Sequence, residues 1–345
     1  MPDKLLGTVR PMRRLIRFVI PVERAGGVLL DFLVERFTYH TRDTWLARIA
    51  EGRMTVNGRC PAPEQVLAAG DELAYDADDI PEPPMDDRIS LVYCDEDLAV
   101  VDKPGNLTCH PGGRYFNHTL WALLKTRHGI GDPTFVNRID RETSGLVVVA
   151  RTPAAARNLR AQFASRTVEK RYLALVEGIF PETCSAAGWI VADFSGEVLT
   201  KRRFVSVPLP DVPSGRRDSP VGEPPEPEAQ WAVTDFRRVS VHGPVSLVEA
   251  LPHTGRLHQI RVALQTLGFP LVGDKLYGVD PGFFLRFCND ELTPEDLRRM
   301  RTRRQALHAA GLRFRHPRTG MPMCFDLPLP EDMQACLGGL DGAHG

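Results

Sequence analysis

Residues 137–150 read NRIDRETSGLVVVA and hold the most informative pattern in the chain. The unbroken apolar run Leu146–Ala150 predicts a buried strand, and the Thr-Ser-Gly before it is typical of a turn. Asp140 is therefore expected on a loop that leads into a core strand. Arg138 and Arg141 flank this carboxylate, and their charge would keep it ionised, as a nucleophile or a base requires. From composition alone, a surface loop held by salt bridges is the favoured interpretation.

A mixture of strands and helices surrounds this segment. Hydrophobic periodicity predicts strands at 89–93, 98–101, 145–150, 172–176, 231–239 and 245–251, and helices at 119–127, 153–165 and 256–267. The helices do not alternate regularly with the strands. We therefore expect an α+β fold with a mixed central sheet and flanking helices, and not a doubly wound sheet.

The length of 345 residues argues for about two domains. The stretch DADDIPEPPMDD at residues 76–87 is acidic and rich in proline, which predicts a semi-rigid linker. On this basis we expect a basic arm over residues 1–23, a small module over 24–75, a main domain over 88–335 and a tail over 336–345. The proline-rich stretch 208–228 is expected to be an insertion in the main domain.

The net charge of −1 hides a segregation of charge along the chain. Twelve carboxylates lie between Asp71 and Asp102, whereas basic residues gather near the N-terminus, over 157–171 and over 298–318. Basic clusters favour a partner rich in phosphates, although solvated helix faces would look the same. No apolar run reaches the ~18 residues of a membrane span, so we expect a cytoplasmic protein with no membrane partner. The seven scattered cysteines form no Cys-x-x-Cys pair, which argues against a zinc ribbon.

Residues 24–75 carry a second recognisable pattern. Two short helices are predicted over 28–37 and 42–51, followed by the strand Met54–Val56, an Asn57-Gly58 turn and a strand around Gly70-Asp71. This order resembles the S-four-like RNA-binding module. The resemblance implies that the second helix and the turn after it face RNA, and it assigns RNA contacts to Arg42, Arg48 and Arg53. A small adaptor without RNA contacts is the alternative.

The main domain resembles the RluA-type RNA pseudouridine synthases in four ordered segments. NRIDRETSGL is similar to the family signature, VVDKPGNLTCHPGG to the first family motif, EKRYLALVEG to the tyrosine motif, and HTGRLHQIRVALQTLGFPLVGDKLYG to the block that follows. The ending RQALHAAGLRFRHPRTG also fits. With the N-terminal module, the resemblance covers about residues 24–335 and implies a largely antiparallel central sheet. Asn137 departs from the family pattern, which has histidine there.

The resemblance implies that residues 88–335 isomerise uridine in RNA to pseudouridine without a cofactor or metal. Asp140 would be the catalytic carboxylate, acting either as nucleophile at C1′ or as base at C2′ of the ribose. Tyr172 would stack on the uracil and assist removal of the C5 proton, with an ordinary half-buried tyrosine as the alternative. Arg261 would pair with Asp140 and keep it oriented and charged.

Other residues receive supporting or RNA-binding roles from the same resemblance. RNA contacts fall to a set of basic side chains around the catalytic segments: Arg138, Arg141, Lys170, Arg256 and His258. They would also help to turn the target uridine out of its stack. Lys103 and His110 are expected to brace the catalytic loop, and Asn137 to replace a supporting hydrogen bond.

Two other functions compete with an RNA pseudouridine synthase. A non-catalytic RNA-binding protein would need no set such as Asp140, Tyr172 and Arg261, and a zinc deaminase would need His-x-Glu with Pro-Cys-x-x-Cys, which this sequence lacks. The substrate is less defined. HPGGRYFNHTL resembles the branch that modifies the tRNA anticodon stem-loop, whereas bacterial relatives with an S-four-like module act more often on large-subunit ribosomal RNA. We expect tRNA by a small margin, and a monomeric enzyme.

Overall fold

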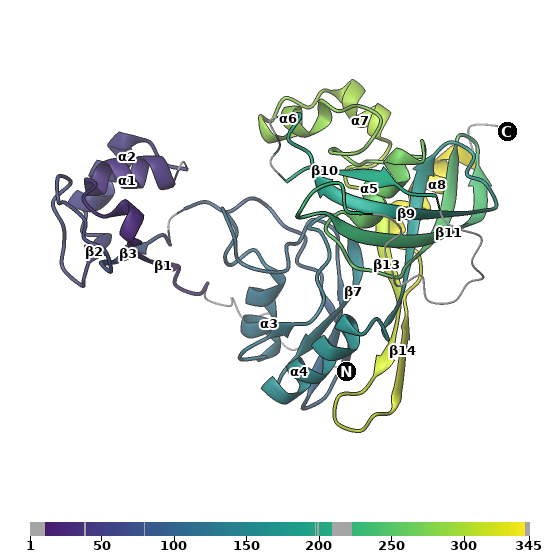
Figure 1. Cartoon of the computed structure of the whole chain (residues 1–345), viewed down its shortest axis with the longest axis horizontal. Helices are drawn as coiled ribbons and strands as arrows, with labels where there is room; N and C mark the ends of the chain where they lie inside the picture. Colours follow the sequence, from purple (N-terminus) through teal and green to yellow (C-terminus); the bar gives the residue numbers. More distant parts are fainter. Residues whose placement is uncertain are drawn as a thin grey trace, which may run out of the picture. The chain divides into compact units, whose positions relative to one another are not determined.

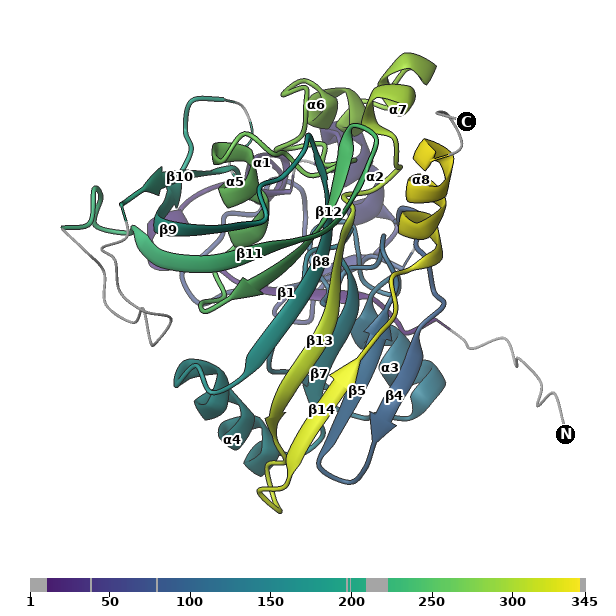
Figure 2. The same ribbon diagram turned by 90° about the vertical axis from the view of Figure 1, so that its right-hand side faces the viewer.

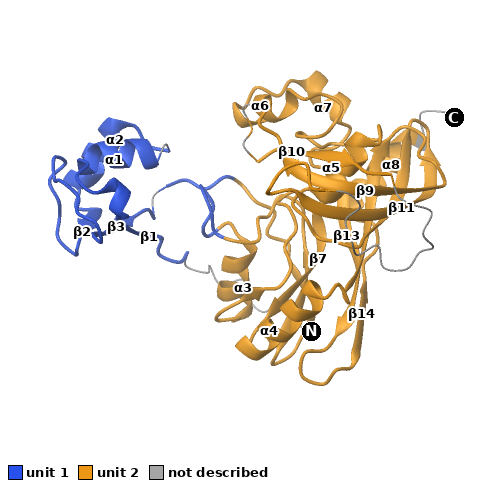
Figure 3. Cartoon of the chain, in the orientation of Figure 1, with its two compact units in different colours: residues 1–83, 111–117 blue, residues 84–110, 118–345 orange. Residues whose placement is uncertain are grey.

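The computed structural model describes residues 11–37, 39–78, 80–196, 198, 200–208 and 223–341 (Figure 1). The chain divides into two compact units (Figure 3). The first holds residues 1–83 and 111–117, and the second holds residues 84–110 and 118–345. Each unit has its own sheet and hydrophobic core. None of the helices in the described ranges has the length and apolar composition of a membrane span.

An eleven-stranded sheet frames the second unit (Figure 2). Its strands are β4 (Ser90–Cys94), β5 (Leu98–Lys103), β6 (Thr134–Phe135), β7 (Ser144–Ala150), β8 (Glu169–Glu177), β9 (Thr183–Ala192), β10 (Arg202–Ser206), β11 (Gln230–His242), β12 (Val245–Pro252), β13 (Leu307–Arg315) and β14 (Pro322–Asp326). The main path runs β10-β9-β11-β12-β8-β13-β7-β5-β4, with β14 on β13 and β6 on β7. All strand pairs that the structure describes in this sheet are antiparallel except β7 with β13. The predicted α+β class and largely antiparallel sheet are confirmed.

Helices cover both faces of this sheet. They are α3 (Leu120–His128), α4 (Pro153–Ala164), α5 (Gln259–Thr266), α6 (Phe283–Cys288), α7 (Pro294–Met300) and α8 (Glu331–Asp341). The periodicity had located α3 and α4 to within one residue at either end. It missed β9, β10, β13 and β14, whose short or interrupted apolar patterns gave too weak a signal.

Strand β7 explains why the sequence has an unbroken apolar run after Gly145. Leu146, Val148 and Ala150 join the core cluster of α4, whereas Val147 and Val149 join that of α3. Successive side chains of a strand point to opposite faces, so a strand covered on both faces needs apolar residues at every position. The run therefore places the loop before β7 firmly against the middle of the domain.

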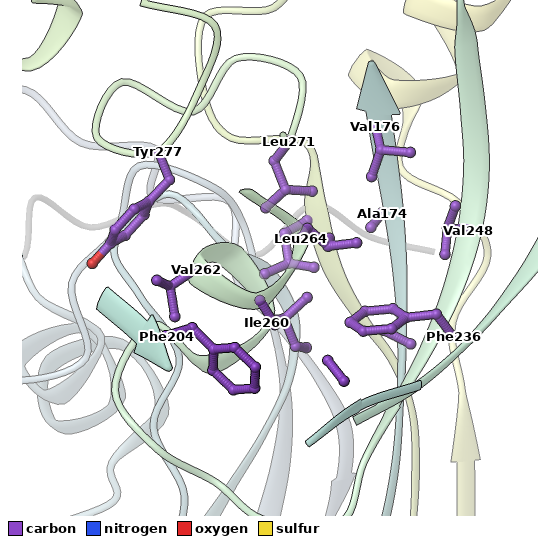
Figure 4. Close-up of a cluster of buried hydrophobic side chains, with 14 of the residues drawn as sticks. Ala174, Val176, Phe204, Phe236, Val248, Ile260, Val262, Leu264, Leu271 and Tyr277 are labelled. Carbon is purple, nitrogen blue, oxygen red and sulfur yellow. The ribbon is translucent and has the colours of Figure 1, made fainter. Parts of the chain in front are cut away.

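The other half of the sheet packs against α5. Ile260 and Leu264 of this helix lie in one cluster with Ala174 of β8, Val248 of β12 and Phe236 of β11 (Figure 4). Buried apolar contacts on one helical face thus fix the helix, and with it any residue on its opposite side.

The first unit has a three-stranded sheet with two helices and a separate core. Its elements are β1 (Leu15–Val19), a 3-10 helix η1 (Val22–Arg24), α1 (Leu29–Arg36), α2 (Arg42–Ala50), β2 (Met54–Val56) and β3 (Glu72–Asp76), and its sheet order is β1-β3-β2. The Asn57-Gly58 turn forms with positive φ at both residues, 51° and 75°, but it returns the chain only to Arg59. The strand that pairs with β2 is the later β3.

Several expected boundaries need correction. Residues 15–19 are not part of a basic arm, because Ile16 and Phe18 pack against the first unit's core and the strand pairs with β3. Helix α8 runs into the expected tail, since Met333 and Leu337 are buried. Residue 77, at the start of the expected linker, belongs to the first core. Residues 1–10, residues 209–222 of the expected insertion and residues 342–345 lie outside the described residues.

The segment HPGGRYFNHTL is also placed differently from its neighbours in sequence, because residues 111–117 belong to the first unit. Glu82 accepts hydrogen bonds from the backbone N–H groups of Phe116 and Asn117, at 2.6 Å and 2.8 Å. The side chain of Asn117 exchanges two further hydrogen bonds with the backbone of Met12, and Arg14 donates to the carbonyl of Gly113 at 2.7 Å.

Candidate active site

The loop before β7 carries Asp140 and is held close to β13. The backbone N–H of Thr143 donates to the carbonyl of Asp140 at 3.1 Å, which closes the turn. Gly145 follows with φ of +110°, and a Cβ there would lie 2.3 Å from the carbonyl oxygen of Ala309. Only glycine permits this close approach of β7 and β13. The turn chemistry predicted from Thr143-Ser144-Gly145 therefore serves a tertiary contact.

Arg261 of α5 binds two carboxylates at once. Its Nη1 lies 2.8 Å from Oδ2 of Asp140, and its Nε and Nη2 lie 2.7 Å and 2.9 Å from the two oxygens of Asp274. Asp274 is fully buried and also accepts from the N–H groups of Leu276 and Tyr277. A buried carboxylate with this many donors is a rigid anchor for the guanidinium.

The segment before β13 supplies a second support. Nε2 of Gln305 lies 2.6 Å from Oγ1 of Thr143 and 3.3 Å from Oδ2 of Asp140. Glu142, next to Thr143, accepts from Nζ of Lys275 at 2.9 Å and from the backbone N–H of Gln305 at 3.1 Å. Asp274, Lys275 and Gln305 lie inside the family-like segments GDKLYG and RQALH, but sequence reasoning assigned no role to them. Their roles depend on proximity to Asp140 in the folded chain, which no local sequence pattern indicates. Gln305, for example, is 165 positions away from Asp140 in the sequence.

The electrostatics of the site keep Asp140 ionised. Burial by itself would raise the pKa of this carboxyl, but the charge of Arg261, that of His258 when protonated and the hydrogen bonds from Arg261 and Gln305 outweigh it and hold the pKa below its usual value. Burial, reinforced by the nearby Arg261, lowers the pKa of His258 to about 4. His258 is therefore neutral at neutral pH, and the stabilising charge comes from Arg261.

Two aromatic side chains lie beside this carboxylate. Tyr172 of β8 packs against the α5 core. Its burial, and to a lesser extent the negative charge of Asp140, raises its pKa well above the usual value. Tyr277 packs its ring 5.0 Å from the guanidinium of Arg261 and makes a hydrogen bond of 2.9 Å with Nδ1 of His258. At neutral pH both tyrosines carry an uncharged phenol.

Helix α5 begins three residues later than predicted. His258 has φ of +58° and is the N-cap, so Arg256 precedes the helix instead of lying on it. Gln259 explains this start, because its Oε1 accepts from the N–H of Arg256 and its Nε2 donates to the carbonyl of Val233, both at 3.0 Å. The buried glutamine ties the loop to β11 and leaves Arg256 exposed.

Lys170 and Arg256 belong to a positively charged group with Arg166. Nζ of Lys170 donates to the carbonyl of Thr254 at 2.8 Å, and Nε of Arg256 to that of Trp231 at 3.2 Å. Burial, together with the charges of Arg166 and Arg256, lowers the pKa of Lys170 to about 8. The three side chains are thus close enough for the positive charges of Arg166 and Arg256 to disfavour the protonated form of Lys170.

The arginines around Asp140 lie in different environments. Arg138 is exposed. Arg141 is half-buried, 3.2 Å from Glu142, and its guanidinium lies 5.3 Å from the ring centre of Phe287. Their proximity to Asp140 follows from the sequence, but neither provides the ion pair that orients the carboxylate.

Three further residues expected to support the loop have distinct contacts. Nζ of the fully buried Lys103 donates to the carbonyls of Pro104, Leu107 and Arg141 at 2.8 to 3.1 Å. Oδ1 of Asn137 accepts from the N–H of Val148 in β7 at 2.7 Å. The ring of His110 packs on Phe135, with centroids 4.3 Å apart.

The three arginines assigned to RNA in the first unit are each paired with a carboxylate. Arg42 lies 2.7 Å from Asp31, and Arg48 and Arg53 lie 3.0 Å and 3.3 Å from Glu51.

Among the described residues, Asp95, Asp97 and His316 form a group with the composition of a metal site. Single ligand atoms of Asp95, Asp97 and His316 lie within 4.8 Å of one another. Nδ1 of His316 accepts from the N–H groups of Arg318 and Thr319, so Nε2 carries the proton that it shares with Asp95 at 2.7 Å. With both ring nitrogens used, this histidine has no lone pair for a metal ion.

Comparison with known proteins gives the family of the chain. A family model described as RNA pseudouridylate synthase matches residues 97–266. "Ribosomal large subunit pseudouridine synthase D" of Pseudomonas aeruginosa is 32% identical, over 91% of this chain and 92% of its own. The chain belongs to the RNA pseudouridylate synthase family. It is thus an isomerase that acts on RNA, of the RluA type that the four segments resemble.

Two further relatives extend the comparison. "tRNA pseudouridine(32) synthase, mitochondrial" of Saccharomyces cerevisiae is 34% identical over 73% of this chain and 50% of its own. The solved structure "Human RNA Pseudouridylate Synthase Domain Containing 1" superposes with a TM-score of 0.53 at 27% identity, over 74% of this chain and 90% of its own. Synthases named for ribosomal RNA and for tRNA therefore both resemble this enzyme.

Proposed function

We propose that Asp140 is the catalytic carboxylate of this synthase and that Arg261 is its positioning residue. The single observation that carries the proposal is the chain of contacts from Asp274 through Arg261 to Asp140. A fixed guanidinium keeps the carboxylate charged and anchors one of its oxygens, and attack on a bound ribose requires both properties.

Two routes are compatible with this carboxylate. As a nucleophile, Asp140 bonds to C1′ and the glycosidic electron pair leaves with N1; after the uracil turns, C5 bonds to C1′ and the carboxylate is released. As a base, Asp140 removes the C2′ proton while the uracil leaves, and it returns that proton when C5 bonds to C1′. In both routes C5 then loses its proton and N1 gains one, so the isomerisation is balanced.

We assign Tyr172 to stacking on the uracil. Removal of the C5 proton by this residue would require a phenolate, and the raised pKa of Tyr172 opposes its formation. A neutral aromatic ring beside the carboxylate is suited to holding a base that has been turned out of its stack.

The positive group of Arg166, Lys170 and Arg256 is proposed to bind a phosphate of the target RNA strand. Lys170 lies two residues before Tyr172 on β8, and Arg256 lies five residues before Arg261, so a phosphate held there would be next to the nucleotide in the site. Arg138, Arg141 and His258 would contact the RNA around the flipped uridine. The first unit would serve as an S-four-like handle through Arg42, Arg48 and Arg53, adding phosphate contacts without reading sequence.

For the substrate we favour large-subunit ribosomal RNA, and tRNA is the second candidate. The segment HPGGRYFNHTL favours tRNA by its resemblance, but three of its residues, Gly113, Phe116 and Asn117, are bound within the chain by Arg14, Glu82 and Met12. A relative that matches nearly end to end is named for the large ribosomal subunit, and this supports the reversal. The yeast mitochondrial relative supports tRNA, although it matches over half of its own length.

The test is to incubate the purified enzyme separately with protein-free large-subunit RNA and with unmodified tRNA transcripts, and to map the pseudouridines formed. We expect efficient product in ribosomal RNA, and none with the Asp140→Asn variant. Product in tRNA alone would overturn the substrate assignment and leave the assignment of Asp140 standing. Product from Asp140→Asn in either RNA would overturn the assignment of the carboxylate.

A further inference from the structure

The contacts of Asp140 are unevenly divided between its two oxygens. Arg261 and Gln305 both donate to Oδ2, at 2.8 Å and 3.3 Å. In the part of the chain that the structure describes, no hydrogen bond reaches Oδ1. The side chain nevertheless keeps 26% of its surface exposed, whereas that of Arg261 keeps 9%. Both donors thus bind the same oxygen, Oδ1 receives no hydrogen bond from the described residues, and part of the side chain is exposed.

The amide of Gln305 is fixed in the orientation that this contact needs. It is buried, and its two N–H bonds are directed to two acceptors, Oγ1 of Thr143 and Oδ2 of Asp140. A flipped amide would place its carbonyl oxygen against a carboxylate, which is repulsive. Its backbone N–H donates to Glu142, so Gln305 is bound to three residues of the catalytic loop: Asp140, Glu142 and Thr143.

We propose that Gln305 is a second positioning residue of the synthase, and that it and Arg261 hold Oδ2 so that Oδ1 meets the ribose. The proposal rests on the assignment of Asp140 made above. Arg261 alone contributes a single hydrogen bond to Asp140, about which the carboxylate could still turn. A second donor on the same oxygen, fixed through Thr143, removes that freedom. A reacting oxygen held in place before substrate binds shortens the search for the reactive geometry.

Two substitutions test this role in the full-length enzyme. Gln305→Leu keeps the size and removes both donors, and we expect kcat to fall about 10- to 100-fold with KM for RNA within about twofold, because binding groups are unchanged. Gln305→Glu places a second carboxylate beside Asp140, so the pair would share a proton and kcat at saturating RNA would rise with pH between about 5 and 7. The wild-type enzyme should be flat over that range, because the pKa of Asp140 is already held below its usual value.

A matched control is Gln162→Leu, since the Gln162 amide also makes several hydrogen bonds, to Asn158 and to the backbone of Arg315, but lies on α4. It should lower stability without changing kcat or the pH profile. Wild-type kcat in Gln305→Leu, or a flat profile in Gln305→Glu, would overturn the proposal. A crystal structure with bound product RNA in which Oδ2 is the oxygen nearer the ribose would do the same. Activity in Asp140→Asn, measured in parallel, would instead refute the underlying assignment of the carboxylate.

Discussion

Asp274 binds Arg261 through both carboxylate oxygens, at 2.7 Å from Nε and 2.9 Å from Nη2, and this pair is buried within the second unit. The remaining Nη1 is directed to Asp140. The planar guanidinium therefore links the rigid position of Asp274 to the loop that carries Asp140, and a point charge could not do so.

Arg261→Ala should lose most of the activity and about 3–5 kcal/mol of the free energy of unfolding, because Asp274 would remain buried without its partner. Arg261→Lys should recover only part of kcat, since an ammonium lacks the fork that spans two carboxylates. Initial rates and urea unfolding of both variants check this, with the exposed Arg203→Ala as control. Near-wild-type kcat in Arg261→Ala would show that the pairing is not needed.

Asp140→Asn should abolish isomerisation while folding and RNA binding stay nearly intact. The substitution keeps size and polarity but removes the negative charge that attack or proton abstraction requires. The measurement is pseudouridine formed under single-turnover conditions together with the Kd for RNA. Asp132→Asn changes an exposed carboxylate and should behave as the wild type. Substantial turnover by Asp140→Asn would contradict the mechanism.

RNA affinity should weaken as pH rises through about 8, where Lys170 loses its proton. Because only the ammonium attracts phosphate, the Kd should rise by at most about tenfold per pH unit above that value. Lys170→Arg stays charged and should remove this dependence. The same lowered pKa makes the free energy of unfolding rise with pH. Between about pH 8 and the usual lysine pKa, the unfolded chain still holds the proton that folded Lys170 has lost, so raising the pH favours the folded state. Equal pH slopes for the two proteins, measured by filter binding from pH 7 to 9, would exclude Lys170.

Replacing Arg42, Arg48 and Arg53 together by Gln should flatten the salt dependence of RNA binding, by a slope of about 1 to 3 in a plot of log K against log salt, with little change in kcat at saturating RNA. Substitution in place is preferable to removal of residues 1–80, because Met12 and Arg14 hold residues 111–117. Arg88→Gln, an exposed arginine paired with Asp86, is the control. An unchanged slope would leave the first unit without a role in RNA binding.

Asn137→Ala should cost about 1–3 kcal/mol, because the N–H of Val148 would be left without an acceptor. Asn137→His, the residue usual in the family, has a ring nitrogen that can accept the same bond and should lose less. Midpoints of urea unfolding for the two variants decide the matter. Equal midpoints for Asn137→Ala and the wild type would mean that this bond contributes nothing to stability.

The sequence by itself determined the elements that local patterns can specify. The apolar run after Gly145 predicted β7, and the helical periodicity predicted α3 and α4. Such predictions succeed because the spacing of apolar residues along the chain indicates which face of an element is buried. The four ordered motifs likewise resemble one family, and that resemblance singled out Asp140, Tyr172 and Arg261.

Only the tertiary structure decided which side chains meet. Gln305 and Asp274 reach the site from segments far from Asp140 in sequence, and the start of α5 depends on a glutamine whose partners lie on another strand. The same holds for residues 15–19 and 111–117, whose place in the first unit follows from contacts with β3, Glu82 and Met12. Hydrogen bonds and ion pairs between distant segments leave no periodic trace in a sequence, because their geometry exists only once the chain has folded.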